Sequence, residues 1–342
     1  MRQPLFKIRQ NSYFGFMNVS GEVVIEPQYL EAGEFHNGFA RVRLNDQWVP
    51  IDAMGRLLLK RIYRMIGPFE EGLARVQVVQ SWGYIDGRGN EVIPARFDEA
   101  GDFSEGLAAV QFEGKTGYLN LQGQFALKPA YTSGGAFNGG LAPAGDSGQC
   151  GFIDASGTFV ITPAWEQCRP FNGPVAVVLR DQTWGLIDRN GREVVPPQFE
   201  FVKGHSHGEF FDGMALAYRD GKYGFVSQQG EIAVEPMFDL AGDYGEGLAL
   251  VEINGAYGYI DKAGKLVIMP KFEDAGVFSE GLAQVRSNGH WGYIDTEGKF
   301  AIPAAYHAAT PFRDGLALTV LEGKWQYIDR FGGVIWRERA EV

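Results

Sequence analysis

Several features that mark other protein classes are scarce or absent in this sequence. No run approaches the roughly 18 apolar residues of a membrane-spanning helix, so we expect no membrane span. Residues 1–10 carry charges and lack an apolar core, which predicts no signal peptide and makes cytoplasmic residence the default expectation. The two cysteines, Cys150 and Cys168, are too few for a disulfide framework. We expect both to be buried free thiols rather than a redox pair.

Basic residues are also too few to favour nucleic acid as a partner. The chain has 31 Lys and Arg against 42 Asp and Glu, a formal net charge of −11, with no acidic or basic tail. A uniformly acidic surface repels phosphate backbones. Hydrophobic residues nevertheless make up 45% of the 342 residues, which is enough to bury a substantial core and excludes wholesale disorder.

Glycine is abundant, with 47 residues, and it recurs at a fixed period. The glycine of Trp82-Gly83-Tyr84-Ile85-Asp86 anchors a repeat of 34 residues, with one longer step of 39. A second glycine follows each anchor by six residues, and an aromatic residue follows by fourteen in every unit that extends so far. The anchors lie at positions 15, 49, 83, 117, 151, 185, 224, 258, 292 and 326, where Val49 and Gln326 replace the glycine.

Each part of the repeat predicts a local structure. Large and small residues alternate over 82–86, which predicts a strand, and the Asp86–Gly89 segment predicts a hairpin turn with a left-handed glycine. Residues 90–93 predict a return strand that ends at a proline, because proline cannot donate to a ladder. Residues 97–106 predict a loop held by two aromatic side chains, and residues 107–111 a third strand. The anchor glycine, without a side chain, suits the close approach of a neighbouring sheet.

One such unit is a three-stranded meander, too small to be stable alone. Neighbouring units must therefore stack and bury their aromatic side chains between them. The sequence predicts an all-β fold with a single array of ten units over residues 4–336 and a C-terminal tail over 337–342. Ten units exceed the usual 4–8 blades of a propeller, and no strand is left to complete a blade across a closure. An open, curved, solenoid-like stack is favoured, with a closed propeller-like ring as the alternative.

The repeated motif resembles the WG-repeat family of bacterial proteins. The run W-G-[YFL]-[IV]-D-x-x-G-x-x-V-I-P-x-x-F is carried by residues 82–97, 184–199 and 291–306. The resemblance implies an all-β tandem-repeat protein and leaves the function open.

A five-residue insertion near residues 203–209 of the sixth unit is the most individual feature of the chain. Insertions in repeat proteins map to loops on one face, often the binding face. The segment 204–208 matches G-x-S-x-G, but a hydrolase needs a helix after the Ser206 position, and a strand is predicted there. His205 and His207, with Glu209 or Asp212, could ligate a metal, although a solvated polar loop is the preferred interpretation. We expect no resident metal and no cofactor.

Acidic residues form two sets of repeated positions. Aspartates three residues after the anchor could form a calcium ladder, but calcium needs six to eight oxygen ligands, so turn formation is the preferred role: Asp52, Asp86, Asp154, Asp188, Asp261, Asp295 and Asp329. Acidic residues in the predicted loops could form a stripe that binds a basic partner, with ordinary solubility as the alternative. Candidate partner-binding residues in this set are Asp98, Glu99, Glu105, Glu246, Asp274 and Glu280.

These observations predict a non-enzymatic binding scaffold. Stacked repeats present a large regular surface, and no catalytic constellation fits its required context. A protein partner is expected to dock on a concave or loop face of the array. The alternatives are a carbohydrate-binding module, which would need exposed aromatic side chains, and a hydrolase or metal-binding site at residues 204–212.

Overall fold

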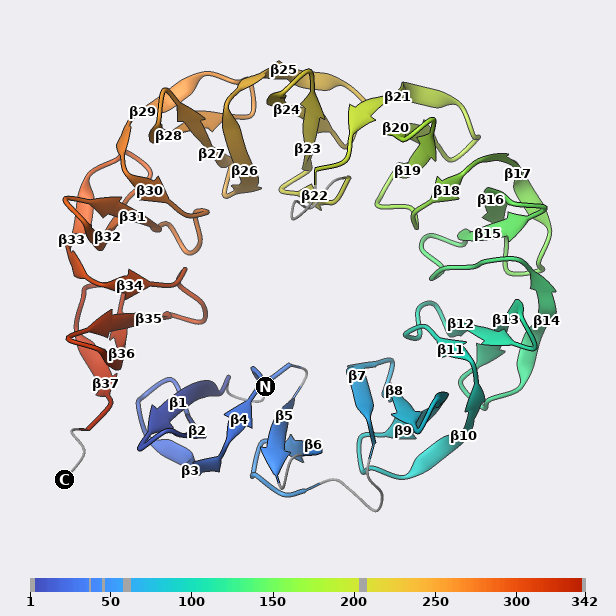
Figure 1. Cartoon of the computed structure of the whole chain (residues 1–342), viewed down its shortest axis with the longest axis horizontal. Coiled ribbons are helices and arrows are strands. Elements are labelled where there is room, and N and C mark those ends of the chain that lie inside the picture. Colours follow the sequence, from blue (N-terminus) through green and yellow to red (C-terminus); the bar gives the residue numbers. More distant parts are fainter. Residues whose placement is uncertain (1–3, 37, 45–46, 58–62, 203–207, 340–342) are drawn as a thin grey trace. The chain divides into compact units, whose positions relative to one another are not determined.

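A computed structural model describes residues 4–36, 38–44, 47–57, 63–202 and 208–339. The chain divides into two compact units, which we call unit 1 (residues 3–27 and 198–342) and unit 2 (residues 28–197). Both consist of small antiparallel sheets (Figure 1). The described ranges contain no helix that could cross a membrane.

Within the described residues, each unit contains five sheets, and the strands β3 and β21 cross the unit boundaries. The sheets of unit 1 are β1 (Phe6–Gln10), β2 (Tyr13–Met17), β3 (Val23–Tyr29); β22 (Phe210–Phe211), β23 (Met214–Arg219), β24 (Lys222–Ser227), β25 (Ile232–Phe238); β26 (Leu240–Gly245), β27 (Leu248–Ile253), β28 (Ala256–Asp261), β29 (Leu266–Phe272); β30 (Asp274–Ala275), β31 (Ala283–Ser287), β32 (His290–Ile294), β33 (Phe300–Tyr306); and β34 (Ala308–Ala309), β35 (Leu316–Leu321), β36 (Lys324–Asp329), β37 (Val334–Arg337).

The sheets of unit 2 are β4 (Glu31–Ala32), β5 (Phe39–Leu44), β6 (Gln47–Asp52); β7 (Met65–Glu70), β8 (Leu73–Val78), β9 (Ser81–Asp86), β10 (Glu91–Phe97); β11 (Glu99–Ala100), β12 (Leu107–Phe112), β13 (Lys115–Asn120), β14 (Phe125–Tyr131); β15 (Ala142–Asp146), β16 (Gln149–Ile153), β17 (Phe159–Trp165); and β18 (Gln167–Cys168), β19 (Val175–Arg180), β20 (Thr183–Asp188), β21 (Glu193–Glu200).

Each sheet begins part-way through one sequence repeat and ends in the next. The strand predicted as third, β12, pairs with β13 of the following repeat, whereas the return strand β10 lies at the edge of the preceding sheet and pairs only with β9. A further first strand makes most sheets four-stranded; it has two residues in five of them, such as β11, and six in β7 and β26. The predicted three-stranded meander is therefore wrong in its frame. Most sheets are four-stranded meanders, which is the construction of a propeller blade.

The hairpin turns have the predicted chemistry. All ten glycines six residues after the anchor have positive φ, from +74° at Gly89 to +85° at Gly157. The carboxylate of Asp86 accepts the backbone N–H groups of Arg88 at 2.9 Å and Asn90 at 2.8 Å. The same pair of bonds forms at every other aspartate of this set, which confirms their turn-forming role: Asp52, Asp154, Asp188, Asp261, Asp295 and Asp329.

The anchor glycine lies under the outer strand of its own sheet. A Cβ on Gly83 would be 2.5 Å from the carbonyl oxygen of Ile93 and 2.6 Å from the nitrogen of Ala95, both on β10. Register shifts between β9 and β10 accompany this close approach. The predicted contact with a neighbouring sheet is therefore wrong, because the contacting backbone belongs to the same sheet.

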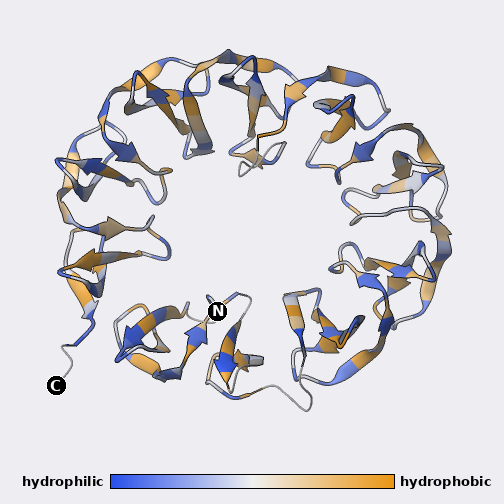
Figure 2. Cartoon of the chain, in the orientation of Figure 1, coloured by the Kyte–Doolittle hydropathy of each residue, from blue (hydrophilic) through white to orange (hydrophobic). Residues whose placement is uncertain are grey.

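The hydrophobic cores lie between consecutive sheets, as the stacking argument predicts. Hydrophobic residues recur along the strands of both units (Figure 2). Tyr84 and Phe97 of one sheet are buried together with Phe103 and Ala108 of the next. The rings of Tyr84 and Phe103 meet edge to face at 4.9 Å, and the Tyr84 hydroxyl donates to the carbonyl of Gly101 at 2.7 Å. Burial raises the pKa of this phenol, so it stays protonated and keeps donating.

Within unit 1, the first sheet of the chain packs against the last. The ring of Phe6 meets that of Tyr327 edge to face at 5.6 Å, and the Tyr327 hydroxyl donates to the carbonyl of Lys7 at 2.9 Å. The guanidinium of Arg9 binds both carboxylate oxygens of Glu338, at 3.0 and 2.9 Å, and lies 5.0 Å from the Trp325 ring. We call these contacts the seam. They contradict the predicted open stack, because the first and last sheets of the chain pack together within unit 1.

One residue type explains how the first sheet fits the last. At the strand position equivalent to Phe6, the other nine sheets have a buried alanine: Ala40, Ala74, Ala108, Ala142, Ala176, Ala215, Ala249, Ala283 and Ala317. Elsewhere a loop aromatic such as Phe103 fills the space in front of this alanine. In the first sheet, whose description begins at residue 4, Phe6 itself reaches the tyrosine of the last sheet. Glu338 and Arg339, expected in a tail, also belong to the seam.

Candidate functional site

In most repeats, the loop before the first long strand of a sheet carries an acidic residue at its tip. Glu105 is followed by Gly106, and both have positive φ, of +54° and +79°. The Glu105 carboxylate accepts the backbone N–H groups of Gly139 at 2.6 Å and Gly140 at 2.9 Å, at the tip of the next loop. We call these bonds, from the acidic residue of one tip to the glycine of the next, the tip bonds.

Tip bonds recur in both units. In unit 2, Gly106 also donates to Glu71 at 3.0 Å. In unit 1, Asp212, Glu246 and Glu280 accept from Gly247, Gly281 and Gly315, respectively. Charge-assisted hydrogen bonds of this kind are roughly twice as strong as neutral ones. They hold the loop tips that they join at fixed positions relative to one another.

The residues predicted to form an acidic stripe therefore separate by environment. Glu105, Glu246 and Glu280 form tip bonds. Asp274 accepts the N–H of Ala275 at 2.8 Å. Asp98 and Glu99 lie seven to six residues before Glu105 and are exposed. The structure thus brings the tip residues of one unit into a row and leaves Asp98 and Glu99 outside that row.

The structure describes the insertion from residue 208 onward. His205, Ser206 and His207 lie outside the described residues. Glu209 is exposed, and Asp212 forms both a tip bond with Gly247 and an ion pair with Lys262 at 2.9 Å. The pKa of Asp212 is lowered, first by the Lys262 ammonium and also by the Gly247 N–H. No group of three metal-ligating side chains lies within the described ranges.

The two cysteines are joined in a disulfide, with their Cα atoms 5.9 Å apart. Cys150 lies on β16 and Cys168 on the short strand β18, so the bond links two neighbouring sheets of unit 2. The expectation of two free thiols is wrong. In the sequence both cysteines belong to one repeat. Because that repeat contributes strands to two neighbouring sheets, the two side chains meet between those sheets.

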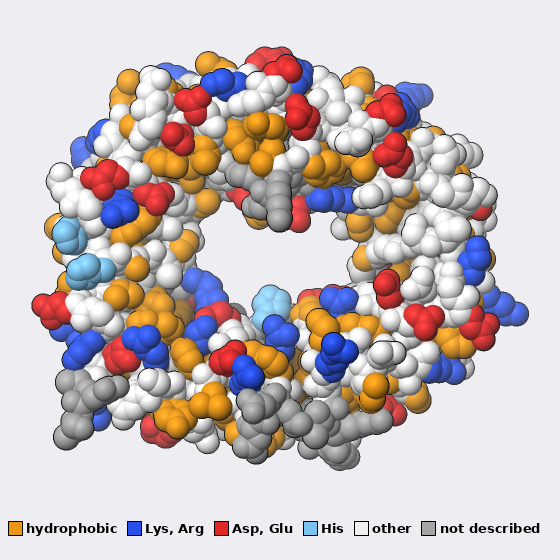
Figure 3. Space-filling view, in the orientation of Figure 1, with side chains coloured by type: hydrophobic (Ala, Val, Ile, Leu, Met, Phe, Trp, Pro, Cys, Tyr) orange, Lys and Arg blue, Asp and Glu red, His pale blue; other side chains and the backbone are white. Residues whose placement is uncertain are grey.

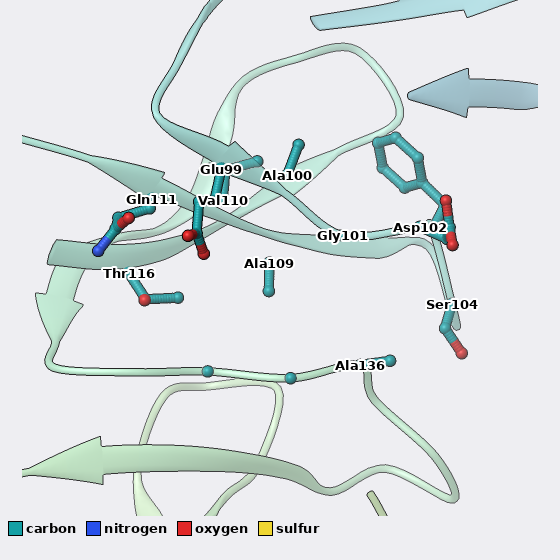
Figure 4. A pocket seen from close by; sticks show the side chains of 13 residues that line it. Glu99, Ala100, Gly101, Asp102, Ser104, Ala109, Val110, Gln111, Thr116 and Ala136 are labelled. Carbon is teal, nitrogen blue, oxygen red and sulfur yellow. The ribbon is translucent and has the colours of Figure 1, made fainter. Parts of the chain in front are cut away.

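Grooves lie between consecutive sheets near the loop tips. One of about 330 Å³ separates β11–β14 from the start of the next sheet in unit 2. Gln111 and Thr116 lie at one end, Asp102 and Ser104 at the other, and Ala109 between them (Figure 4). Burial raises the pKa of Asp102, although the nearby Arg75 guanidinium acts in the opposite direction.

A second groove, of about 390 Å³, lies at the equivalent place between β4–β6 and β7–β10. Its walls include Arg41, Arg75, Phe39, Phe69 and Trp82. Arg41 occupies the repeat position that Ala109 has in the first groove. The two volumes fall in the lower range of small-molecule sites. Sequence reasoning missed both grooves, although the basic residues at this repeat position in the first repeats were a visible signal.

Comparison with known proteins gives the family. The description "WG containing repeat" matches residues 14–48, 51–78, 82–115, 117–145, 151–183, 184–223, 223–255, 257–290 and 291–325. The chain belongs to the WG containing repeat family. The matched segments follow the sequence repeat, including the longer sixth copy, and confirm the resemblance drawn from the motif.

The structure places the two residues that give the WG repeat its name. The glycine admits the outer strand, as described for Gly83. The tryptophan, one residue earlier, packs against a cation of the preceding strand: Trp82 lies 5.6 Å from the Arg75 guanidinium and Trp48 lies 5.7 Å from that of Arg41. In these copies the motif therefore fixes an arginine at the groove wall.

Two solved structures that match most of the chain have low sequence identity to it. A crystal structure of "the eukaryotic initiation factor" has 11% identity and a TM-score of 0.55, covering 98% of this chain and 96% of that one. BamB from Moraxella catarrhalis has 13% identity and a TM-score of 0.37, with coverage of 90% and 96%. The first likeness supports the fold alone. No curated protein matches the chain.

Proposed function

We propose that this WG-repeat protein is a non-enzymatic scaffold that binds a protein partner along its rows of loop tips. The observation that carries the proposal is the series of tip bonds, which fixes neighbouring loops relative to one another. A preformed surface loses less conformational entropy on binding than a flexible one. Repeat proteins use such regular surfaces to bind extended partners.

The chemistry of the tips supports binding rather than catalysis. The carboxylates of Glu105, Glu246 and Glu280 accept backbone N–H groups of the neighbouring loop tips, which holds them in place as structural groups. On the face shown in Figure 3, acidic and basic side chains are interspersed with apolar ones. A mixed surface of this kind suits a protein partner better than a polyanion.

Site-specific photo-crosslinking tests the proposal. A benzophenone amino acid replaces Asn138 or Phe211 at loop tips, and Val160 or Met269 on outer strands serves as the matched control in the same units. Val160 is 54% exposed and Met269 is 65% exposed, so the controls are accessible.

After irradiation in cells of the native host, both tip variants should form an adduct with the same protein, and the outer-strand variants should not. Adducts from the outer strands alone, or none from any position, would contradict binding at the tips. Circular dichroism and melting temperature show whether each variant keeps the wild-type fold.

A further inference from the structure

The two grooves of unit 2 are repeat-equivalent but differ in chemistry. In the groove of Figure 4, the floor residue is the small, apolar Ala109. In the groove between β4–β6 and β7–β10, the same repeat position is Arg41. The backbone frame is thus shared, and the side chain at one position sets the charge of the groove.

Arg41 has free hydrogen-bonding capacity. Within the described part of the chain, no hydrogen bond or ion pair engages its side chain. The guanidinium lies 5.7 Å from the Trp48 ring, and the residue is exposed. Arg75, the other cation of this groove, is already engaged: its Nε lies 3.0 Å from an Asp102 oxygen and its Nη1 donates to the carbonyl of Ala100 at 3.0 Å. Arg41 is therefore the cation available to a ligand.

Aromatic side chains line much of the rest of the groove, together with Glu34 and His36. The rings of Phe39 and Phe69 lie 4.2 Å apart with an interplanar angle of 33°. Trp82 is half-buried, and the side chain of Met65 is 49% exposed at the rim. These walls offer apolar surface beside a guanidinium, and a ring or apolar chain can be buried against them.

We propose that this groove binds a small ligand with one carboxylate and an apolar or aromatic body. The planar guanidinium of Arg41, held over Trp48, presents paired N–H donors to the carboxylate. The body of the ligand lies against the aromatic walls. A single negative charge is favoured over a polyanion, because Arg41 is the one arginine of the groove without a described carboxylate or carbonyl partner and Glu34 also lines the groove. The chain as a whole carries a net charge of −11, which further disfavours a polyanion.

Phenylacetate is the probe that tests the proposal, and phenylacetamide, which has the same ring without the charge, is its matched control. Binding is followed by ligand-observed NMR and by the fluorescence of the tryptophans. Phenylacetate should bind saturably, with the ring protons receiving the strongest magnetisation transfer. Phenylacetamide should bind at least about tenfold more weakly, because a charge-assisted hydrogen bond is lost.

Protein variants locate the site. Arg41→Ala should weaken phenylacetate binding by about tenfold or more. Arg96→Ala removes another exposed arginine that lies over an aromatic ring, 5.1 Å from Phe97, and should leave binding unchanged. Phenyl phosphate distinguishes a carboxylate site from a general anion site, and tighter binding of phenyl phosphate would overturn the carboxylate assignment.

Three results would overturn the proposal: no saturable binding of phenylacetate, equal binding of acid and amide, or unchanged binding by Arg41→Ala. The melting temperature of each variant is measured first, and Arg41→Lys, which keeps the charge but not the paired donors, should restore only part of the affinity. The outcome is independent of the protein-partner proposal, since the crosslinking positions at the loop tips lie outside this groove.

Discussion

At the scale of single residues, carboxylates fix the turns of this protein. Asp154 accepts hydrogen bonds from the Ser156 hydroxyl and the Thr158 backbone N–H, and these hold the pKa of its carboxyl below the ordinary value. Burial raises the pKa of Asp86 and Asp188, but their hydrogen bonds lower it by more, so the net shift is also downward. The sequence predicted this role because aspartate followed by glycine has a specific turn chemistry.

Acid should therefore destabilise the fold through these aspartates. A carboxyl whose pKa is depressed in the folded state stabilises the protein above the unfolded pKa, and this stabilisation is lost as the pH falls through the folded value. The variant Asp86→Asn/Asp154→Asn/Asp188→Asn should lose less stability between pH 6 and pH 3 than the wild type. Chemical unfolding across about pH 3–6, which spans the ordinary Asp pKa, measures it.

Asparagine is a suitable replacement because the chain already uses it. Asn120 accepts the N–H groups of Gln122 and Gln124 at 3.1 and 3.0 Å in the same turn position. The variant should consequently stay folded at neutral pH. An acid dependence equal to that of the wild type would show that the turn aspartates do not contribute to it.

Residue types alone did not predict the contacts that the acidic loop residues make. The acidic residues of the loops could be identified from their positions, but not their bonds to the next loop. Those bonds depend on the left-handed backbone at residues such as Glu105 and on the distance between tips. Neither quantity follows from residue type. The same holds for Arg41, whose free guanidinium became visible only beside the engaged Arg75.

At the scale of strands and sheets, the repeat predicted the strands well and their partners less well. The strands predicted over 82–86 and 107–111 form as β9 and β12. The return strand was expected to end at Pro94, but β10 continues to Phe97. The pairing of β12 with the next repeat was not predicted, because a 34-residue period has no marked starting point. Hydrophobic alternation locates a strand but does not say which neighbour it joins. The disulfide was missed for the same reason.

The anchor position tests the description of the sheet. Gly83→Ala should destabilise unit 2 by about 1–3 kcal/mol, because its Cβ would lie 2.5 Å from the Ile93 carbonyl oxygen and force the outer strand to move. Gly33→Ala is the matched control, since the nearest atom to its Cβ, the Arg41 carbonyl oxygen, is 3.6 Å away. Urea unfolding compares the two variants, and equal stabilities would contradict the assigned close approach.

Natural departures from glycine agree with this explanation. Gln326 occupies the anchor of the last sheet and is buried, but the outer strand β37 there ends at Arg337, whose guanidinium donates to the Gln326 amide oxygen at 2.9 and 2.6 Å. Val49 occupies the anchor of the β4–β6 sheet, where residues 58–62 lie outside the described ranges. In the last sheet, a side chain is thus found at the anchor where the outer strand is short.

At the scale of the whole chain, the sequence predicted an array of ten copies but not the packing of the first sheet against the last. Closure was expected to need a strand exchanged between the first and last sheets, and none was available. In unit 1 the first and last sheets instead pack together through the side chains of the seam. The signal was present in the sequence: nine alanines and one phenylalanine share a strand position. Its meaning required knowing that this position faces a tyrosine of the preceding sheet.

The seam should contribute measurably to stability. Phe6→Ala removes a side chain that is only 2% exposed and should destabilise unit 1 by about 3–5 kcal/mol. Phe331→Ala, in the same unit, removes a ring that is 94% exposed and should have little effect. Thermal unfolding of the two variants measures the difference. Equal melting temperatures would show that Phe6 does not join the ends.

The most direct test of the account is the distance between the two ends of the chain. Ketoxime spin labels at residues 11 and 339, introduced through p-acetylphenylalanine, leave both cysteines untouched, and pulsed electron resonance measures their separation. Gln10 accepts a hydrogen bond from the Arg339 N–H at 2.9 Å. The seam therefore predicts one narrow distribution of label-to-label distances below about 30 Å, the width of three stacked sheets. A broad distribution, or one near the roughly 90 Å of an extended ten-sheet stack, would contradict the seam.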